Sequence, residues 1–74
     1  MISRKNLDDL TEDYKKALVL VHEAATILEE ASVTAEAVSP EFARHSGMLI
    51  RDAEMVYRFI NSSLARLHRT TPDT

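Results

Sequence analysis

The sequence predicts an all-α protein that folds as an antiparallel two-helix hairpin. Two long stretches place apolar residues at steps of three and four, which is the spacing of one face of a helix. One strong helix-start signal, Ser39-Pro40-Glu41, separates the two stretches. We therefore expect one helix over about residues 5–32 and a second over about 40–68. No repeat or long linker divides the chain, so residues 1–74 are expected to form a single domain.

The first helix carries a heptad seam of apolar residues in which alanine recurs, so that a facing helix can approach closely. Asn6 is placed to cap its start, and Asp8 and Asp9 follow where negative charge suits the positive end of the helix dipole. The run Ser32-Val33-Thr34 forms helices poorly, so we expect the helix to end there, and whether residues 34–38 extend it stays open. The expected seam comprises Leu7, Leu10, Tyr14, Ala17, Val21, Ala24, Leu28, Ala31, Ala35 and Val38.

The second helix begins at the firmest local signal in the chain. Ser39 suits the capping position, Pro40 suits the first helical position, and a glutamate follows in the first turn. Gly47 is its weak point, at about 1 kcal/mol relative to alanine in a helix interior. Residues 69–74 include a proline and no apolar side chain, so we expect this tail to fray. The expected seam comprises Phe42, Ser46, Leu49, Ala53, Val56, Ile60 and Leu67, with Tyr57 and Leu64 beside it.

Both helices carry more apolar surface than one neighbouring helix can cover. On the first helix the apolar arc spans roughly 200° of the helical wheel, which is wider than the stripe that faces one partner. Surplus apolar area favours association, either as a homodimeric four-helix bundle or in a groove of another helical protein. The hairpin is thus expected to be completed by oligomerisation or by a helical partner. The residues expected to bind that partner are Leu18, Leu20, Ala25, Ile27, Met48, Met55 and Phe59.

Composition and charge argue against several other classes of protein. The chain has no cysteine, which removes disulfides and thiolate chemistry together and fits a reducing compartment. We see neither a signal-peptide pattern nor an apolar run of the roughly 20 residues that span a bilayer, so we expect a cytoplasmic protein without membrane contact. The formal charge of −3, with acids concentrated in residues 7–38, argues against a nucleic-acid partner.

The sequence offers no catalytic, metal or cofactor site. The three histidines never stand four residues apart, and there is no His-Glu-x-x-His motif. A chain with one glycine has no glycine-rich phosphate loop, so we expect no enzyme activity, no cofactor and no small-molecule substrate. Arg44, Arg51 and Arg58 recur every seven residues, and Glu54 is spaced to pair with the last two, which favours a solvated face over a nucleic-acid stripe.

One short motif suggests an alternative function. The run His22-Glu23-Ala24-Ala25-Thr26 lies on the polar arc of the first helix and resembles the phospho-acceptor box of histidine-kinase dimerisation domains. Those domains are helical hairpins that dimerise, so the resemblance implies a phosphotransfer four-helix bundle that uses His22. Ile27 stands where those domains carry proline. The simpler interpretation is a solvated histidine on a polar face.

The chain also resembles a second family over most of its length. Pro40-Glu41-Phe42 at the start of the second helix, Ala53-Glu54 in its middle and Phe59-Ile60 towards its end are similar to the YscE-like co-chaperones of type III secretion needle subunits. The resemblance implies a cytoplasmic helical hairpin that binds a second chaperone built of TPR-like helical repeats. Together the two chaperones would keep the needle subunit unpolymerised. The acidic, alanine-rich first helix departs from that pattern, so only the type of partner carries over.

Overall fold

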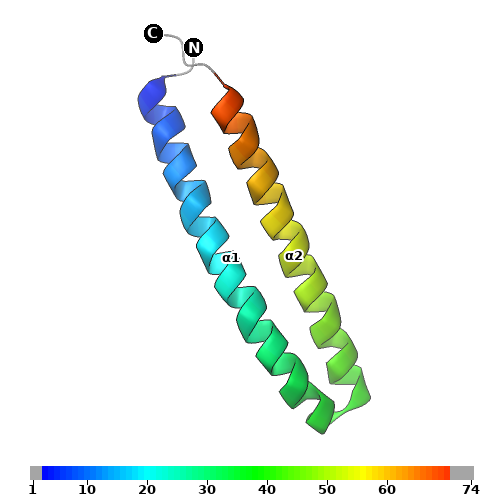
Figure 1. The fold of residues 1–74 in the computed structure, drawn as a ribbon. Helices are drawn as coiled ribbons and strands as arrows, with labels where there is room; N and C mark the ends of the chain where they lie inside the picture. Colours follow the sequence, from blue (N-terminus) through cyan, green and yellow to red (C-terminus); the bar gives the residue numbers. More distant parts are fainter. Residues whose placement is uncertain (1–2, 71–74) are drawn as a thin grey trace.

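The chain folds as two long antiparallel helices, which confirms the expected all-α hairpin (Figure 1). The computed structural model describes residues 3–70. Helix α1 spans Arg4–Val38 and helix α2 spans Pro40–Arg69. They lie side by side along their whole length, in a rod of 57 × 14 × 13 Å.

Helix α1 extends to Val38 rather than ending near residue 32, so residues 34–38 are helical. Serine, valine and threonine lose at most about 0.7 kcal/mol each relative to alanine within a helix, a small penalty for a helix that continues to pack. Ser32 and Ala35 are both half-buried in the described structure. Tertiary packing therefore overrides the weak propensity of this segment.

The start of α1 is capped by Ser3, and the expectation that Asn6 caps it is wrong. The Ser3 side-chain oxygen accepts a hydrogen bond from the Asn6 backbone N–H at 3.1 Å, and its carbonyl accepts one from the Leu7 N–H, also at 3.1 Å. The helix therefore begins three residues earlier than an Asn6 cap would require. Asp8 and Asp9 fall beyond the first turn, which contains no acidic residue.

Ser39 alone joins the two helices. Its backbone is extended, with φ −170° and ψ 157°. Its N–H donates to the Ala35 carbonyl at 3.0 Å and closes α1, while its side-chain oxygen accepts from the Phe42 N–H at 3.3 Å and opens α2. Pro40 occupies the start of α2, where its missing N–H is not needed. The expected start of the second helix is thus confirmed.

Helix α2 ends at Arg69, so the first residue of the expected frayed tail is helical. Thr70 closes the helix, donating its backbone N–H to the Leu67 carbonyl and its hydroxyl to the Arg66 carbonyl. Arg66, His68 and Arg69 in the last turn suit the negative end of the helix dipole. Residues 71–74 lie outside the described residues.

The contact between the helices is a heptad seam, which we call the hairpin seam. Its members are less exposed than their neighbours and follow each other at steps of three and four in both helices. In α1 they are Leu7, Thr11, Tyr14, Leu18, Val21, Ala25, Leu28, Ser32 and Ala35. In α2 they are Ala43, Ser46, Ile50, Ala53, Tyr57, Ile60, Leu64 and Leu67.

Half of the expected seam is therefore wrong. Every second residue of the expected α1 seam faces α2 as expected, namely Leu7, Tyr14, Val21, Leu28 and Ala35. Between them, the seam contains the residue that follows the expected one in the sequence, for example Thr11 in place of Leu10. In α2 the shift is the same, because Ile50 and Tyr57 replace Leu49 and Val56. Apart from the half-buried Ala17, the apolar residues left out of the seam are exposed.

The core of the isolated hairpin is thin. Among the described apolar side chains only Leu64 is buried, and Ser46 is the one buried polar residue. Two helices cannot surround each other, so every other seam residue keeps some contact with solvent. Most of the apolar side chains are thus only half covered.

Candidate functional site

The hairpin seam is flanked by two unlike surfaces. One flank, the polar face, carries Asp8, Lys15, His22, Glu29 and Glu36 from α1 and Gly47, Glu54, Asn61 and His68 from α2. The other flank, the apolar face, carries Leu10, Ala17, Ala24, Ala31 and Val38 from α1 and Phe42, Leu49, Val56 and Ser63 from α2. Equivalent rows of two antiparallel helices lie on the same side of their seam, so each face is built by both helices.

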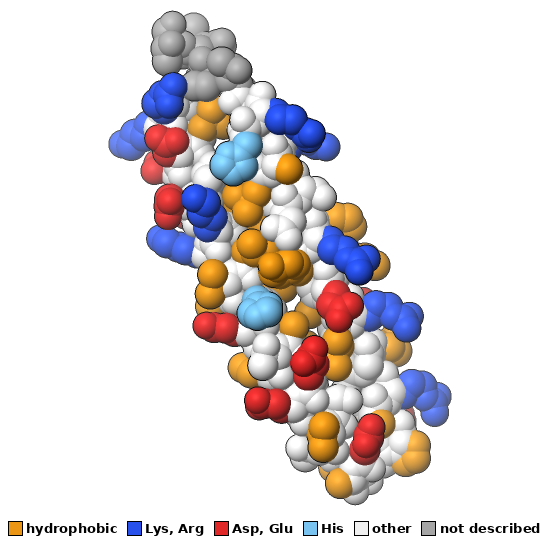
Figure 2. Space-filling view, viewed as in Figure 1, with side chains coloured by type: hydrophobic (Ala, Val, Ile, Leu, Met, Phe, Trp, Pro, Cys, Tyr) orange, Lys and Arg blue, Asp and Glu red, His pale blue; other side chains and the backbone are white. Residues whose placement is uncertain are grey.

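Figure 2 shows a face with polar character. Figure 2 shows one histidine over the middle of the rod and another nearer its upper end, with acidic side chains along the upper edge of α1 and over the lower half of the rod. Lys and Arg side chains line the outer edge of α2 and also lie on the upper part of α1. Apolar side chains show mainly along the line where the helices meet.

The apolar face leaves large side chains in contact with solvent. Their exposed fractions range from 38% for Leu10 to 65% for Val38, with Phe42, Leu49 and Val56 between them. The alanines of the α1 row are small, so the side chains of this row protrude less from the face than those of the α2 row. Leu20 and Ile27 extend the face outward on α1, and Phe59 does so on α2.

The apolar face is hollowed near the turn. A cleft of about 450 Å³ lies between the last turns of α1 and the first turns of α2, lined by Ala31, Thr34, Ala35, Val38, Phe42 and Ser46. Its lining is almost wholly apolar, since only two hydroxyl-bearing side chains contribute to it. A hollow of this kind can receive an apolar side chain of a partner.

The seven residues expected to bind a partner fall in three places. Leu20, Ile27 and Phe59 are exposed at the edges of the apolar face, and Met48 and Met55 are exposed on the side of α2 that points away from α1. Leu18 and Ala25 are half-buried in the hairpin seam, so the hairpin covers them only in part, and their contact with a partner stays a prediction.

Phe42, Leu49 and Val56 are exposed on the apolar face, although their spacing predicts that they belong to the seam. The signal that could have found them is the presence of two overlapping heptad rows in each helix. One row pair is enough for a hairpin, and the second pair is left for another contact.

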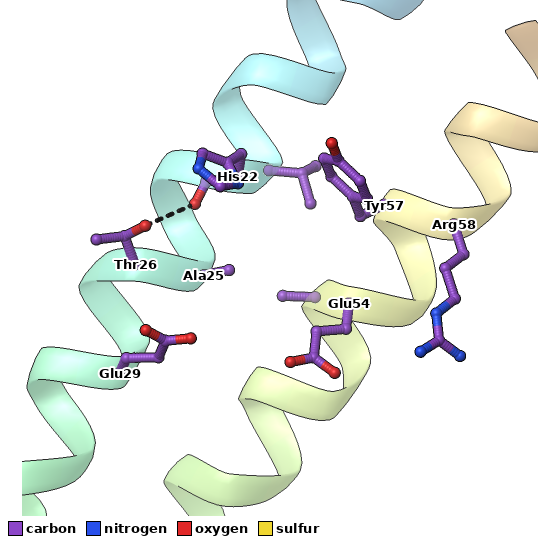
Figure 3. Close-up of a pocket in the computed structure, with 9 residues that line it drawn as sticks. His22, Ala25, Thr26, Glu29, Glu54, Tyr57 and Arg58 are labelled. Atoms are coloured by element: carbon purple, nitrogen blue, oxygen red, sulfur yellow. Dashed lines mark hydrogen bonds between the residues drawn. The ribbon is translucent and has the colours of Figure 1, made fainter.

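His22 lies on the polar face, in a cleft of about 320 Å³ between the two helices (Figure 3). Its ring lies 6.1 Å from the ring of Tyr57, measured between centroids, with 49° between the ring planes. Glu29, Glu54 and Arg58 also line this cleft. The imidazole is exposed and reachable from solvent.

The Thr26 hydroxyl is engaged within α1, because it donates a hydrogen bond to the His22 carbonyl at 3.2 Å. It contacts the backbone of His22 rather than its ring (Figure 3). The cleft therefore presents an exposed histidine beside an aromatic ring.

Residues 3–70 show neither a metal-binding cluster nor a membrane-spanning helix. No three histidine, cysteine or acidic side chains of this part of the chain are grouped to hold a metal ion. Within the same range, neither helix combines the length and apolar character that crossing a membrane requires.

The fold and its surface define a class: a helical hairpin with one polar face and one large unpartnered apolar face. The chain matches no protein-family model, no curated protein and no solved structure. The resemblances to needle co-chaperones and to kinase dimerisation domains therefore rest on the sequence motifs quoted above.

Proposed function

We propose that this chain is a non-catalytic protein-interaction module whose apolar face packs against helices of a protein partner. One observation carries the proposal: Phe42, Leu49 and Val56 form a row of large apolar side chains that is exposed along α2. Exposed apolar patches of several hundred Å² mark interaction sites on soluble proteins. Burying such a patch at about 25 cal/mol per Å² contributes several kcal/mol to association.

In its more specific form, the proposal makes the chain a cytoplasmic co-chaperone of type III secretion. The TPR-like chaperone of such a system has helical repeats whose grooves accept apolar helix faces. The co-chaperone and the chaperone would then hold the needle subunit unpolymerised. The length of the hairpin and the residues of α2 that resemble the YscE-like family support this form.

Photo-crosslinking in the producing cells tests the general proposal. A photo-reactive phenylalanine analogue replaces Leu49 on the apolar face or, as a control, Arg51 on the outer side of α2. We expect irradiation to yield a protein adduct from position 49 and little from position 51. Equal yields from the two positions, or no adduct at either, would contradict the proposal. Finding a TPR chaperone in the adduct would support the secretion role.

A second candidate function is phosphotransfer through His22. The observation that favours it is the exposed imidazole in an open cleft beside Tyr57. Incubation with a cognate histidine kinase and ATP should then place an acid-labile phosphate on the chain, and His22→Ala should abolish it. His68→Ala is the matched control, because His68 is also exposed on the polar face and should keep the label.

A further inference from the structure

We propose that the apolar face is occupied by a second copy of this chain, which forms a four-helix bundle with both interhelical turns at the same end. This inference rests on the general form of the proposed function, because it names a second copy, in place of a TPR-like chaperone, as the occupant of the same face. It is carried by four observations: the number of seams, the exposed area, the sizes of the side chains and the distribution of charge.

Each helix carries two contact rows but has one neighbour. Val21 and Leu28 belong to the hairpin seam, and together with Ala24 they also belong to a second heptad row that points to the apolar face. Rows of this kind, about 100° apart around a helix, are what a helix with two neighbours needs. The apolar face therefore fits two further helices of matching length and spacing, which a second hairpin supplies.

The exposed area is larger than that of a compact monomer. The chain exposes 5916 Å². A compact folded monomer of its mass, 8.3 kDa, exposes about 4,600 Å², so the excess is about 1,300 Å². A stable interface buries about 800 Å² on each partner. The excess, summed over the whole surface, thus exceeds the area that each partner of a stable dimer buries.

The sizes of the side chains select which helices meet. The row of α1 on the apolar face is rich in alanine, whereas that of α2 carries Phe42, Leu49 and Val56. If α1 packed on α1 of the second copy, small side chains would face small side chains and leave a void between the helices. Packing α1 on α2 of the second copy sets Leu49 and Val56 against Ala31 and Ala24, which fills the space at these two levels.

The level of each residue along the rod follows from the contact between His22 and Tyr57. Both helices rise by about 1.5 Å per residue and run in opposite directions. A residue of α1 that lies a given number of positions before His22 is therefore at the same height along the rod as the residue of α2 that lies the same number of positions after Tyr57. Leu20 is thus level with Phe59, and Asp13 is level with Arg66. When the two turns lie at the same end, this relation also holds between copies.

Charge selects the same arrangement. Residues 4–38 carry eight acidic and four basic side chains, and residues 40–69 carry three acidic side chains and five arginines. With α1 packed on α2 of the second copy, the acidic helix meets the basic helix. At the rim, Asp13 of one copy lies level with the arginine at position 66 of the other, and Leu20 lies level with the phenylalanine at 59. The opposite arrangement pairs like charges.

The oligomeric state of the full chain tests the inference first. Sedimentation equilibrium should give twice the mass of the chain. Val56→Asp, on the apolar face, should raise the dimer dissociation constant by at least about 100-fold, because it buries a carboxylate without a partner. Met55→Asp is the matched control, since Met55 lies next in sequence but points away from α1, and it should remain dimeric.

Cysteine crosslinking tests the arrangement without disturbing the core. The chain has no cysteine of its own. Chains carrying Leu20→Cys, mixed with chains carrying Phe59→Cys, should form a mixed disulfide on mild oxidation. Each variant alone should crosslink poorly. Efficient crosslinking of Leu20→Cys with itself would overturn the arrangement, because it places α1 on α1.

The outcomes separate this inference from the proposed function. A wild-type chain that is monomeric at all concentrations, yet forms adducts with another protein from position 49, would overturn the second copy and leave the interaction module intact. A monomer without adducts at position 49 would overturn both. A dimer that Val56→Asp and Met55→Asp weaken equally would overturn the apolar face as the interface.

Discussion

The ring of His22 on α1 lies 6.1 Å from the ring of Tyr57 on α2. This contact links the middle of one helix to the middle of the other and marks the register of the hairpin. Tyr57 is half-buried in the hairpin seam, whereas His22 is exposed on the polar face beside it. The two residues thus have different structural importance, although their rings are close together.

Tyr57→Ala should destabilise the fold by about 2 kcal/mol, because it removes a large, half-buried ring from the seam. Urea unfolding followed by circular dichroism, at one fixed protein concentration, measures the change. His22→Ala, at an exposed position, should change the free energy of unfolding by less than about 0.5 kcal/mol. Equal losses from both substitutions would contradict the assignment of the seam.

Gly47→Ala should stabilise the protein by about 1 kcal/mol, since alanine is the better helix former in the interior of α2. A Cβ at this position meets no atom within 4 Å, so the substitution introduces no clash. Thermal unfolding measures the gain. Ala65→Gly, at another exposed position of α2, should lose a similar amount, and a loss on Gly47→Ala would show that position 47 needs glycine.

Ser39→Ala should destabilise the hairpin by about 1 kcal/mol, because it removes the side-chain oxygen that accepts the Phe42 N–H. Ser39→Asp retains a capping oxygen and should keep most of the stability. Ser62→Ala, an exposed site within α2, serves as the control and should have little effect. If Ser39→Ala unfolds like the control, the cap contributes nothing measurable.

Asp13→Arg should weaken the proposed dimer by up to about fivefold, the usual range for an exposed ion pair. It places two positive charges together at the rim, because the new arginine of one copy lies level with Arg66 of the other.

Adding Arg66→Asp to the same chain should restore the dissociation constant, because the charges are then exchanged. Sedimentation at low salt gives the three values, and high salt should reduce the differences. Additive weakening in the double variant would contradict the arrangement with both turns at one end.

The sequence alone determined that the chain forms two helices joined at Ser39. A serine, a proline and a glutamate in succession carry that information locally, because capping depends on neighbouring residues only. It also determined that apolar surface exceeds what a hairpin covers, since the width of the apolar arc is a property of each helix by itself. These features did not need the fold.

Local propensity failed at two helix ends. Ser3 and Asn6 are both good capping residues, so residue type alone does not decide which of them caps the start of α1. Ser32-Val33-Thr34 predicts the end of a helix, yet α1 continues to Val38 because the seam continues through Ser32 and Ala35. Packing of α1 against α2 outweighs a few tenths of a kcal/mol per residue.

The tertiary structure alone decided which apolar rows meet within the hairpin. Leu49 and Ile50 fit the spacing of the seam equally well, since each continues a pattern of steps of three and four in α2. Periodicity describes one helix and carries no information about the direction of its neighbour. The single residue between the helices, Ser39, joins α2 to α1 in one rotational setting. In that setting Ile50 faces α1 and Leu49 is left on the apolar face.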